Sequence, residues 1–113
     1  MATLCAFALI TDEGSRVLLC RRKKDKKWNL PGGYANAAEA PWDAVVREVQ
    51  EELGAEVRVL GVRGLYYVRS KDDLVLTFAC SAPSGKVQAG DEIQEVGWFE
   101  KFLKKGPIPS PSK

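Results

Sequence analysis

The chain has 113 residues, of which 45% are hydrophobic and 28% are charged, and its formal net charge is +2. This length supports one hydrophobic core, the composition excludes disordered and fibrous proteins, and the charge by itself does not indicate nucleic-acid binding. Histidine is absent, which excludes Ser-His-Asp and Cys-His hydrolases and imidazole-bound zinc, so an enzyme of this sequence needs carboxylates, Lys, Arg, Tyr or a hard metal ion.

The N-terminal run at residues 1–10 is apolar, and we interpret Leu4–Ile10 as a buried strand. The run is too short to span a membrane and has no positive residue before it, unlike a signal peptide. Cys5, Cys20 and Cys80 each lie in an apolar stretch, which is typical of reduced core thiols in a cytoplasmic protein. We therefore expect a cytoplasmic protein without a membrane partner.

Further strand-like runs follow, separated by turn signals rich in Gly, Ser and Asp. The first two strands are predicted to form a hairpin around Asp12–Ser15. Further turns are predicted at Gly61–Gly64 and at Ser70–Asp73, between the later strands. The expected strands after the first are Arg16–Arg21, Glu56–Val62, Leu65–Arg69, Leu74–Ala82 and Glu95–Phe99.

One segment, Pro41–Leu53, has the periodicity of an amphipathic helix. Proline suits the first helical turn, and Gly54 suits the position after the last turn. The helix is placed after the second or third strand of a mostly β chain, which indicates the α+β class. Its expected buried stripe consists of Trp42, Val45, Val46, Val49 and Leu53.

The C-terminal segment is predicted to contain a short helical turn at Lys101–Lys105. The Pro/Ser-rich residues 106–113 that follow are predicted to be a flexible tail. One domain over residues 1–105 is therefore expected.

Three carboxylates, Glu48, Glu51 and Glu52, crowd the end of the predicted helix beside its apolar stripe. Like charges one turn apart and negative charge at a helix C-terminus are both unfavourable. A Glu-rich solvated face is one interpretation; an oxygen cluster for a hard cation, Mg²⁺ or Mn²⁺, is the other. Arg47 lies four residues before Glu51 and can hold that carboxylate in place.

The glycine-rich turn Leu30–Tyr34 lies upstream of this helix, and adjacent glycines let a backbone approach a metal or a phosphate closely. Turn, Glu39 and helix together give a fixed spacing: Gly33-x5-Glu39-x7-Arg47-Glu48-Val49-x-Glu51-Glu52-x-Gly54-Ala55. This pattern resembles the Nudix box of the MutT-like hydrolases. Two positions differ: Ala55 replaces a larger aliphatic residue, and Ala38 stands where many members carry glycine. The similarity covers about residues 4–103.

The resemblance implies a Nudix-type α/β/α sandwich with a mixed β-sheet, here with a short or truncated C-terminal helix. It implies Mg²⁺-dependent hydrolysis of the pyrophosphate linkage in a nucleoside diphosphate derivative, by attack of water at phosphorus. Arg47 would orient the acids, while Gly33, Glu39 and Gly54 would shape the loop and the helix end. The implied metal ligands are the backbone carbonyl of Gly32 and the side chains of Glu48, Glu51 and Glu52.

The general base is left open between Glu48 and Glu92. Glu92 is alternatively a further metal ligand, or else an exposed turn acid. The basic cluster at residues 21–27 reads as a solvated loop, a phosphate-binding surface or a polynucleotide surface. Through the resemblance, Arg21 and Arg22 are expected to contact the substrate, with the backbone of Gly33.

Tyr66 is expected to stack on the nucleobase, as Tyr67 and Trp28 could, although each of these rings also suits a core. We expect a (d)NTP or a modified (d)NTP as substrate, because residues 55–82 lack the proline of ADP-ribose-preferring members and the upstream motif of coenzyme A hydrolases is absent.

Two alternatives come from other classes of function. A Nudix-fold nucleotide-binding or sensor module would not turn its ligand over, and the complete acid set argues against it. A small RNA-binding domain would bind without Mg²⁺ and lose affinity in salt, and we expect no nucleic-acid partner. The short C-terminus leaves open whether the fold is minimal or a partner subunit, such as a second copy, covers one face of the sheet.

Overall fold

The computed structural model describes residues 2–100, whose elements confirm the α+β class. These residues form one α-helix, one 3₁₀ turn and seven strands. In chain order the elements are β1 (Thr3–Ile10), β2 (Val17–Arg22), β3 (Trp28–Asn29), β4 (Gly32–Tyr34), α1 (Pro41–Leu53), β5 (Val59–Val68), η1 (Arg69–Lys71), β6 (Asp73–Cys80) and β7 (Ile93–Phe99).

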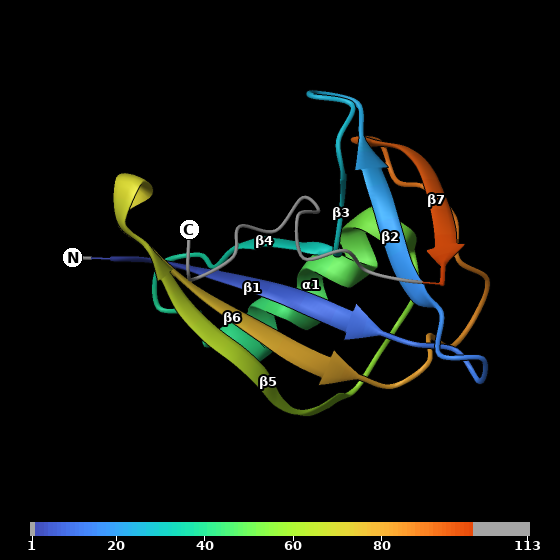
Figure 1. Ribbon diagram of the computed structural model, residues 1–113, viewed down its shortest axis with the longest axis horizontal. Coiled ribbons are helices and arrows are strands. Elements are labelled where there is room, and N and C mark those ends of the chain that lie inside the picture. The colour runs from blue at the N-terminus through green and yellow to red at the C-terminus, as the bar shows by residue number, and fades with distance from the viewer. Residues whose placement is uncertain (1, 101–113) are drawn as a thin grey trace.

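The strands form two sheets (Figure 1). Sheet A has the order β4-β1-β6-β5, and it is mixed because β1 runs parallel to β6 and antiparallel to β4. Sheet B has the order β3-β2-β7 and is antiparallel. In Figure 1, β2 and β7 cross the direction of β1 and β6 steeply. The expected mixed sheet is therefore confirmed, and a second sheet stands beside it.

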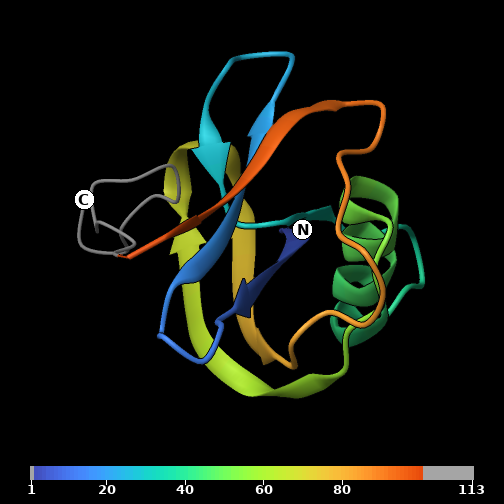
Figure 2. The same cartoon turned by 90° about the vertical axis from the view of Figure 1, so that its right-hand side faces the viewer.

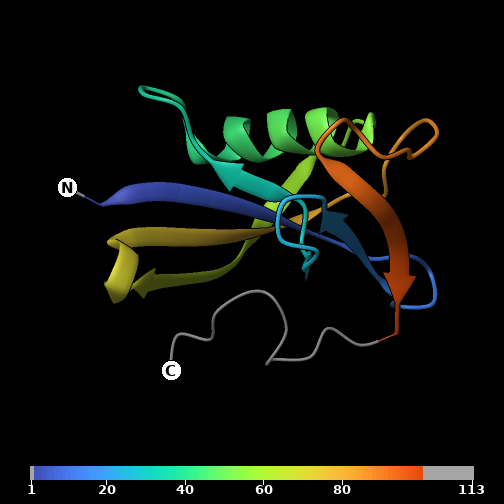
Figure 3. The same ribbon diagram turned by 90° about the horizontal axis from the view of Figure 1, so that it is seen from above.

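Helix α1 lies along one face of sheet A, as two further views show (Figures 2 and 3). Its bounds are those predicted, with Pro41 in the first turn and Gly54 in a left-handed conformation, φ 64°, after the last. The helix falls short of the length and apolar character that a membrane crossing needs, and the described residues contain no other α-helix. Its buried side chains are Ala44, Val45, Val49 and Leu53.

The prediction that Trp42 belongs to the buried stripe is wrong, because this side chain is 57% exposed. Val46, also predicted there, is partly buried against the core. Helical periodicity sets the direction of a side chain, but it does not determine whether another element lies opposite. The stripe therefore packs at its middle and its end and leaves the first turn in solvent.

Strand β2 lies between two apolar clusters, which explains its uninterrupted apolar sequence. Leu18 and Cys20 face the main core beneath α1. Val17 and Leu19 point the other way and pack with Leu30 in a second cluster. Because successive strand residues face opposite sides, this strand is buried on both.

The predicted hairpin between the first two strands is wrong. A single bridge, Thr11 to Val17, joins their ends, and the strands then enter different sheets. Strand β2 pairs with β3 and β7 in place of β1.

The predicted turn at Gly61–Gly64 is also wrong. The segment runs through the middle of β5, where the register against β6 shifts between Val59 and Gly61 and again between Val62 and Gly64. Glycines therefore mark bulges of one long strand here, as they often do in strand interiors.

The helix follows the fourth strand, not the second or third, because the short strands β3 and β4 precede it. The helical turn predicted at Lys101–Lys105 and the tail predicted at residues 106–113 lie outside the described residues. The prediction of a short or truncated C-terminal helix falls on that segment too, and α1 is the one helical layer within residues 2–100.

Candidate active site

The turn between β3 and β4 meets the end of α1 through Gly32. Its backbone N–H donates to Oε1 of Glu52 at 3.0 Å. Its φ is 150°, and a Cβ here would lie 2.2 Å from the carbonyl oxygen of Ala6 and 2.7 Å from Cα of Phe7. Only glycine therefore brings this backbone against β1 while presenting its N–H to the helix.

Gly33 makes room for the second acid. A Cβ on Gly33 would lie 2.8 Å from Oε2 of Glu48, so this carboxylate rests directly against the glycine backbone. We call Gly32, Gly33, Glu48 and Glu52 the acid–glycine junction. The spacing of the sequence pattern thus brings both glycines of the turn to two acids of the helix.

Arg47 holds the remaining acids. Its Nε and Nη2 donate to Glu39 at 2.9 and 3.0 Å, while its Nη1 reaches both oxygens of Glu51 at 3.2 Å and Oε2 of Glu48 at 3.3 Å. Nη2 also donates to the carbonyl of Tyr34 at 3.1 Å. One guanidinium therefore joins the loop to the helix, and its hydrogen bonds lower the pKa of Glu39.

The carboxylates of the junction are desolvated. Burial raises the pKa of Glu52 to about 7, and burial also raises the pKa of Glu48 despite the opposing charge of Arg47. Cys20 lies beside Glu52, with Sγ 3.8 Å from Oε1, and burial raises the pKa of this thiol to about 12. A bound cation, in addition to the charge of Arg47, would offset the free-energy cost of burying these two carboxylates.

Oxygen atoms of Glu48, Glu52 and the Gly32 carbonyl are donors of the kind that Mg²⁺ and Mn²⁺ prefer. Among residues 2–100, no three His, Cys, Asp or Glu side chains already converge as a metal site. The Gly32 carbonyl accepts from Nη2 of Arg22 at 3.1 Å, and Arg47 holds Glu51. The donor chemistry fits a hard cation, and binding requires these side chains to turn from their present partners.

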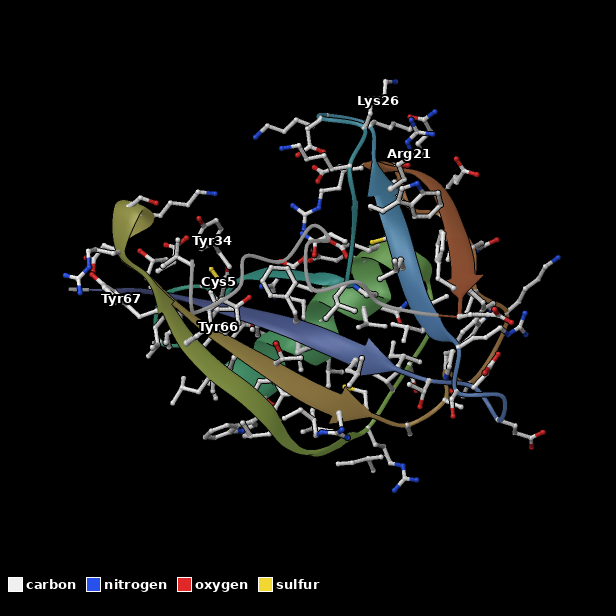
Figure 4. The ribbon with its side chains drawn as sticks, in the orientation of Figure 1. Cys5, Arg21, Lys26, Tyr34, Tyr66 and Tyr67 are labelled. Atoms are coloured by element: carbon white, nitrogen blue, oxygen red, sulfur yellow. The ribbon has the colours of Figure 1, made fainter. Side chains whose placement is uncertain are left out.

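A pocket of about 360 Å³ lies on the face of sheet A opposite α1. Cys5 and Phe7 line it, while Ala6 and Ala8 between and beyond them face the core beneath the helix. Figure 4 shows Cys5 gathered with two tyrosines that also line this pocket. Of the acid–glycine junction, Gly33 lines the pocket and the two acids do not, so the junction meets the pocket through this glycine of β4.

The two arginines that were predicted to contact the substrate point in different directions. Arg22 lines the pocket. Arg21 points away, with Nε donating to the carbonyl of Lys26 at 3.0 Å and Nη1 to Glu95 at 3.3 Å. Figure 4 shows Arg21 and Lys26 near the tip of the β2–β3 loop. Alternation along β2 therefore gives the pocket one arginine of the pair.

The three aromatic candidates also differ in position. Tyr66 lines the pocket. The hydroxyl of Tyr67 donates to Asp72 at 2.6 Å, and its exposed side chain alternates to the other face of β5. Trp28 packs edge-to-face on Phe99, with ring centroids 4.8 Å apart. Tyr66 is thus the ring available to a ligand in this pocket.

Glu92 belongs to the loop that covers the end of α1. In that loop, the N–H of Gln88 donates to the carbonyl of Leu53 at 2.9 Å, and that of Gly90 donates to the carbonyl of Glu52 at 2.8 Å. The side chain of Glu92 is exposed, and its carbonyl accepts from the N–H of Lys23 at 3.0 Å. Its predicted role as base or metal ligand stays a prediction.

The sequence interpretation missed four polar residues of the pocket, namely Asn29, Tyr34, Lys71 and Asp73. Asp73 is 5% exposed and accepts a hydrogen bond from the hydroxyl of Tyr34 at 2.8 Å. Asp73 was assigned to a turn at Ser70–Asp73, but it is the first residue of β6. The alternating pattern of β6 is the signal that could have placed it on the face of Val75.

Residues 1–101 match the family model described as NUDIX domain. A Bacillus subtilis protein with the provisional name 8-oxo-dGTP diphosphatase is 32% identical, over 96% of this chain and 71% of that protein. An ADP-ribose pyrophosphatase of Methanocaldococcus jannaschii is 30% identical, over 80% and 58% of the two chains. The crystal structure of a MutT NUDIX hydrolase from Burkholderia pseudomallei matches with TM-score 0.76 and 26% identity, over 98% and 89%. This chain spans 58% to 71% of the length of three curated relatives.

Proposed function

This chain belongs to the Nudix family, and we propose that it hydrolyses the pyrophosphate linkage of a nucleoside diphosphate derivative, a (d)NTP or a modified (d)NTP. The observation that carries the proposal is the acid–glycine junction, which meets a pocket through Gly33. Two desolvated carboxylates beside glycine backbone fit a cation–diphosphate site. The two named relatives differ in their nucleotide, and both names specify cleavage of a diphosphate linkage.

Mg²⁺ or Mn²⁺, held by the Gly32 carbonyl, Glu48, Glu51 and Glu52, would neutralise the diphosphate and activate a water. Arg47 orients the acids through its hydrogen bonds to three of them. Arg22, Lys24 and Lys27 line the pocket and attract the phosphate groups.

The base that accepts a proton from the attacking water is proposed to be Glu48 or Glu92. Contact with Gly33, which lines the pocket, supports Glu48. The exposed position of Glu92 leaves it free to approach a bound substrate.

The test is a hydrolysis screen in Mg²⁺ over (d)NTPs, oxidised (d)NTPs, nucleotide sugars and dinucleoside polyphosphates. Wild-type protein is compared with Glu52→Gln and with Glu56→Gln, a control at an exposed position beyond the helix. We expect phosphate or pyrophosphate release that falls roughly 100-fold or more in Glu52→Gln and persists in Glu56→Gln. Turnover that survives Glu52→Gln would remove the acid–glycine junction from the chemistry.

A nucleotide-binding module without turnover is the second candidate. It is favoured by the observation that Arg47 binds Glu48 and Glu51 directly, while no three acids of residues 2–100 converge on a metal. Tight binding of a nucleotide without any product, across the whole panel, is the result that would select this candidate.

A further inference from the structure

Asp73 is a buried charged residue on the wall of the pocket. The hydroxyl of Tyr34 donates to its Oδ2 at 2.8 Å, and the neighbouring Cys5 thiol is a weak donor. One hydrogen bond from a neutral hydroxyl compensates poorly for burying a carboxylate, which is stable when several donors or a positive charge surround it. The carboxylate therefore has capacity for further donors from within the pocket.

The register of sheet A explains why these groups share one face. Tyr34 of β4 pairs with Cys5 of β1, which pairs with Val75 of β6, which pairs with Tyr66 of β5. Asp73 lies two residues before Val75, so its side chain points to the same side. Figure 4 shows Tyr34, Cys5 and Tyr66 at one end of the sheet.

Two further polar atoms of this pocket lack partners. The hydroxyl of Tyr66 and Nε of Arg22 are buried, and neither has a hydrogen-bond partner among the described residues. Buried polar atoms in native proteins are nearly always paired with protein, water or ligand. Tyr66 and Arg22 both line the pocket, but these two atoms are themselves covered, so the side chains must turn before a polar ligand pairs with them.

Basic residues lie at both ends of the pocket: Arg22 and the loop residues Lys24 and Lys27 at one end, with Asp25, and Lys71 near Asp73 at the other. Among the described residues no ion pair joins Lys71 to Asp73, so this carboxylate keeps Tyr34 as its hydrogen-bond donor.

Gly32, beside Arg22, pairs with Phe7 of β1, whereas Asp73 pairs with Thr3, four residues away along the same strand. At about 3.3 Å per residue, the two ends lie roughly 13 Å apart. A nucleotide whose phosphates lie at the acid–glycine junction therefore places its base near Asp73 and Tyr66.

The bases differ in what they offer a carboxylate, which only accepts hydrogen bonds. The pairing edge of guanine presents two adjacent donors, N1–H and the N2 amino group, and suits a carboxylate with a free oxygen. Uracil and thymine present one N–H between two carbonyl oxygens. A carboxylate and these carbonyl oxygens are all acceptors and repel one another. Adenine and cytosine present one amino group beside a ring acceptor.

We propose that Asp73 is a specificity-determining residue that accepts hydrogen bonds from a guanine-type base, with Tyr66 forming the wall beside that base. Tyr34 positions Asp73, since its hydroxyl holds the carboxylate while its own carbonyl is held by Arg47. The inference rests on the proposed function for its substrate class.

The test compares kcat/KM for GTP, dGTP, UTP and dUTP in the full chain and in Asp73→Asn. The Asn side chain keeps the shape and one acceptor for Tyr34, but it replaces the other oxygen by an amide donor. Loss of a hydrogen bond to a charged group lowers the guanine-to-uracil ratio by roughly 10- to 100-fold, through KM more than kcat.

Asp72→Asn is the matched control. Asp72 is exposed, contacts Tyr67 outside the pocket, and has φ 54°, a conformation that Asn tolerates. This variant keeps the wild-type ratio. An unchanged ratio in Asp73→Asn, or a ratio in the wild type that does not favour guanine, would overturn the proposal.

A binding arm separates this proposal from the proposed function. Calorimetric titration with GMP and UMP in EDTA measures base preference without turnover. Guanine-favouring binding that Asp73→Asn abolishes supports the role of Asp73 even if the wild type hydrolyses nothing, and equal binding of GMP and UMP refutes it. If Asp73→Asn does not fold, Tyr34→Phe replaces it, and unchanged preference in that variant overturns the proposal.

Discussion

Ala38 passes through a left-handed backbone conformation that ordinarily selects glycine. Its φ is 62°, and it is the third residue of a turn closed by the N–H of Glu39 and the carbonyl of Asn36 at 3.0 Å. A residue with a Cβ adopts this conformation at a cost of about 1 kcal/mol. The departure from the family pattern at Ala38 therefore affects stability and leaves the acids in place.

We predict that Ala38→Gly stabilises the protein by about 1 kcal/mol and raises its Tm by several degrees. The preceding residue gives the control, because Ala37 has no positive φ and Ala37→Gly adds only freedom to the unfolded chain. Thermal unfolding of both variants checks this. A Tm for Ala38→Gly no higher than that for Ala37→Gly would show that the turn is unstrained.

Glu52 gives a prediction for the pH dependence of the metal-free protein. Burial raises its pKa in the folded state from 4.5 to about 7, so between these values the folded state binds more protons than the unfolded state. The contribution of this group to stability is complete below about pH 4.5 and is lost as the pH rises through about 7.

Glu52→Gln removes this titration and keeps an oxygen acceptor for the N–H of Gly32. In EDTA, above the pKa of Glu52, the variant is expected to be more stable than the wild type by about 3 kcal/mol, since one pKa unit corresponds to about 1.4 kcal/mol. Urea unfolding of both proteins across the pH range provides the measurement. If the free energies of unfolding of the two proteins changed with pH in the same way, Glu52 would not have the raised pKa of a buried carboxylate.

The residue roles that sequence could predict are local ones. The pairing of Arg47 with Glu51 follows from helical spacing, and it is present at 3.2 Å. The hydrogen bond between Tyr34 and Asp73 joins residues 39 positions apart, and it depends on the register of β4, β1 and β6. A single sequence does not contain that register, so Asp73 was read as part of a turn.

At the scale of elements, α1 was predictable because its signals are local. A proline in the first turn, an apolar stripe and a glycine after the last turn all agree. Strands β3 and β4 were not predictable, since two and three residues are too few to show a period. The bulged strand β5 was divided in two because glycine marks both bulges and turns.

The loop that covers the end of α1 depends on Gly90, a glycine to which the sequence analysis gave no role. A Cβ on Gly90 would lie 2.3 Å from the carbonyl oxygen of Glu51. Since this obstacle is helix backbone, the loop itself would have to move. Gly90 therefore allows the loop to donate its N–H to the carbonyl of Glu52.

Gly90→Ala is predicted to destabilise the protein by about 2 kcal/mol, in the range of overpacked substitutions. Gly61→Ala is the control, because a Cβ there meets no atom within 4 Å, and its effect is expected within about 0.5 kcal/mol. Urea unfolding of the two variants decides. Equal free energies of unfolding for Gly90→Ala and Gly61→Ala would mean that the loop moves to fit the added Cβ without destabilising the protein.

At the scale of the whole molecule, the site has one end that sequence predicts and one that it does not. The acid–glycine junction follows from spacing within residues 32–54, which a linear pattern records. The pocket requires the face of sheet A together with residues of the β2–β3 loop such as Lys24 and Lys27. Its substrate preference is therefore a property of the assembled sheets.

Cation binding at the acid–glycine junction is the step on which the proposed hydrolysis depends. The direct measurement is a calorimetric titration of Mn²⁺ into wild-type protein, Glu52→Gln and Glu56→Gln, above the pKa of Glu52, about 7. The wild type and Glu56→Gln are predicted to bind the ion alike, and Glu52→Gln to bind it roughly tenfold or more weakly. Equal affinity in all three proteins, or no binding by the wild type, would contradict a metal site at this junction.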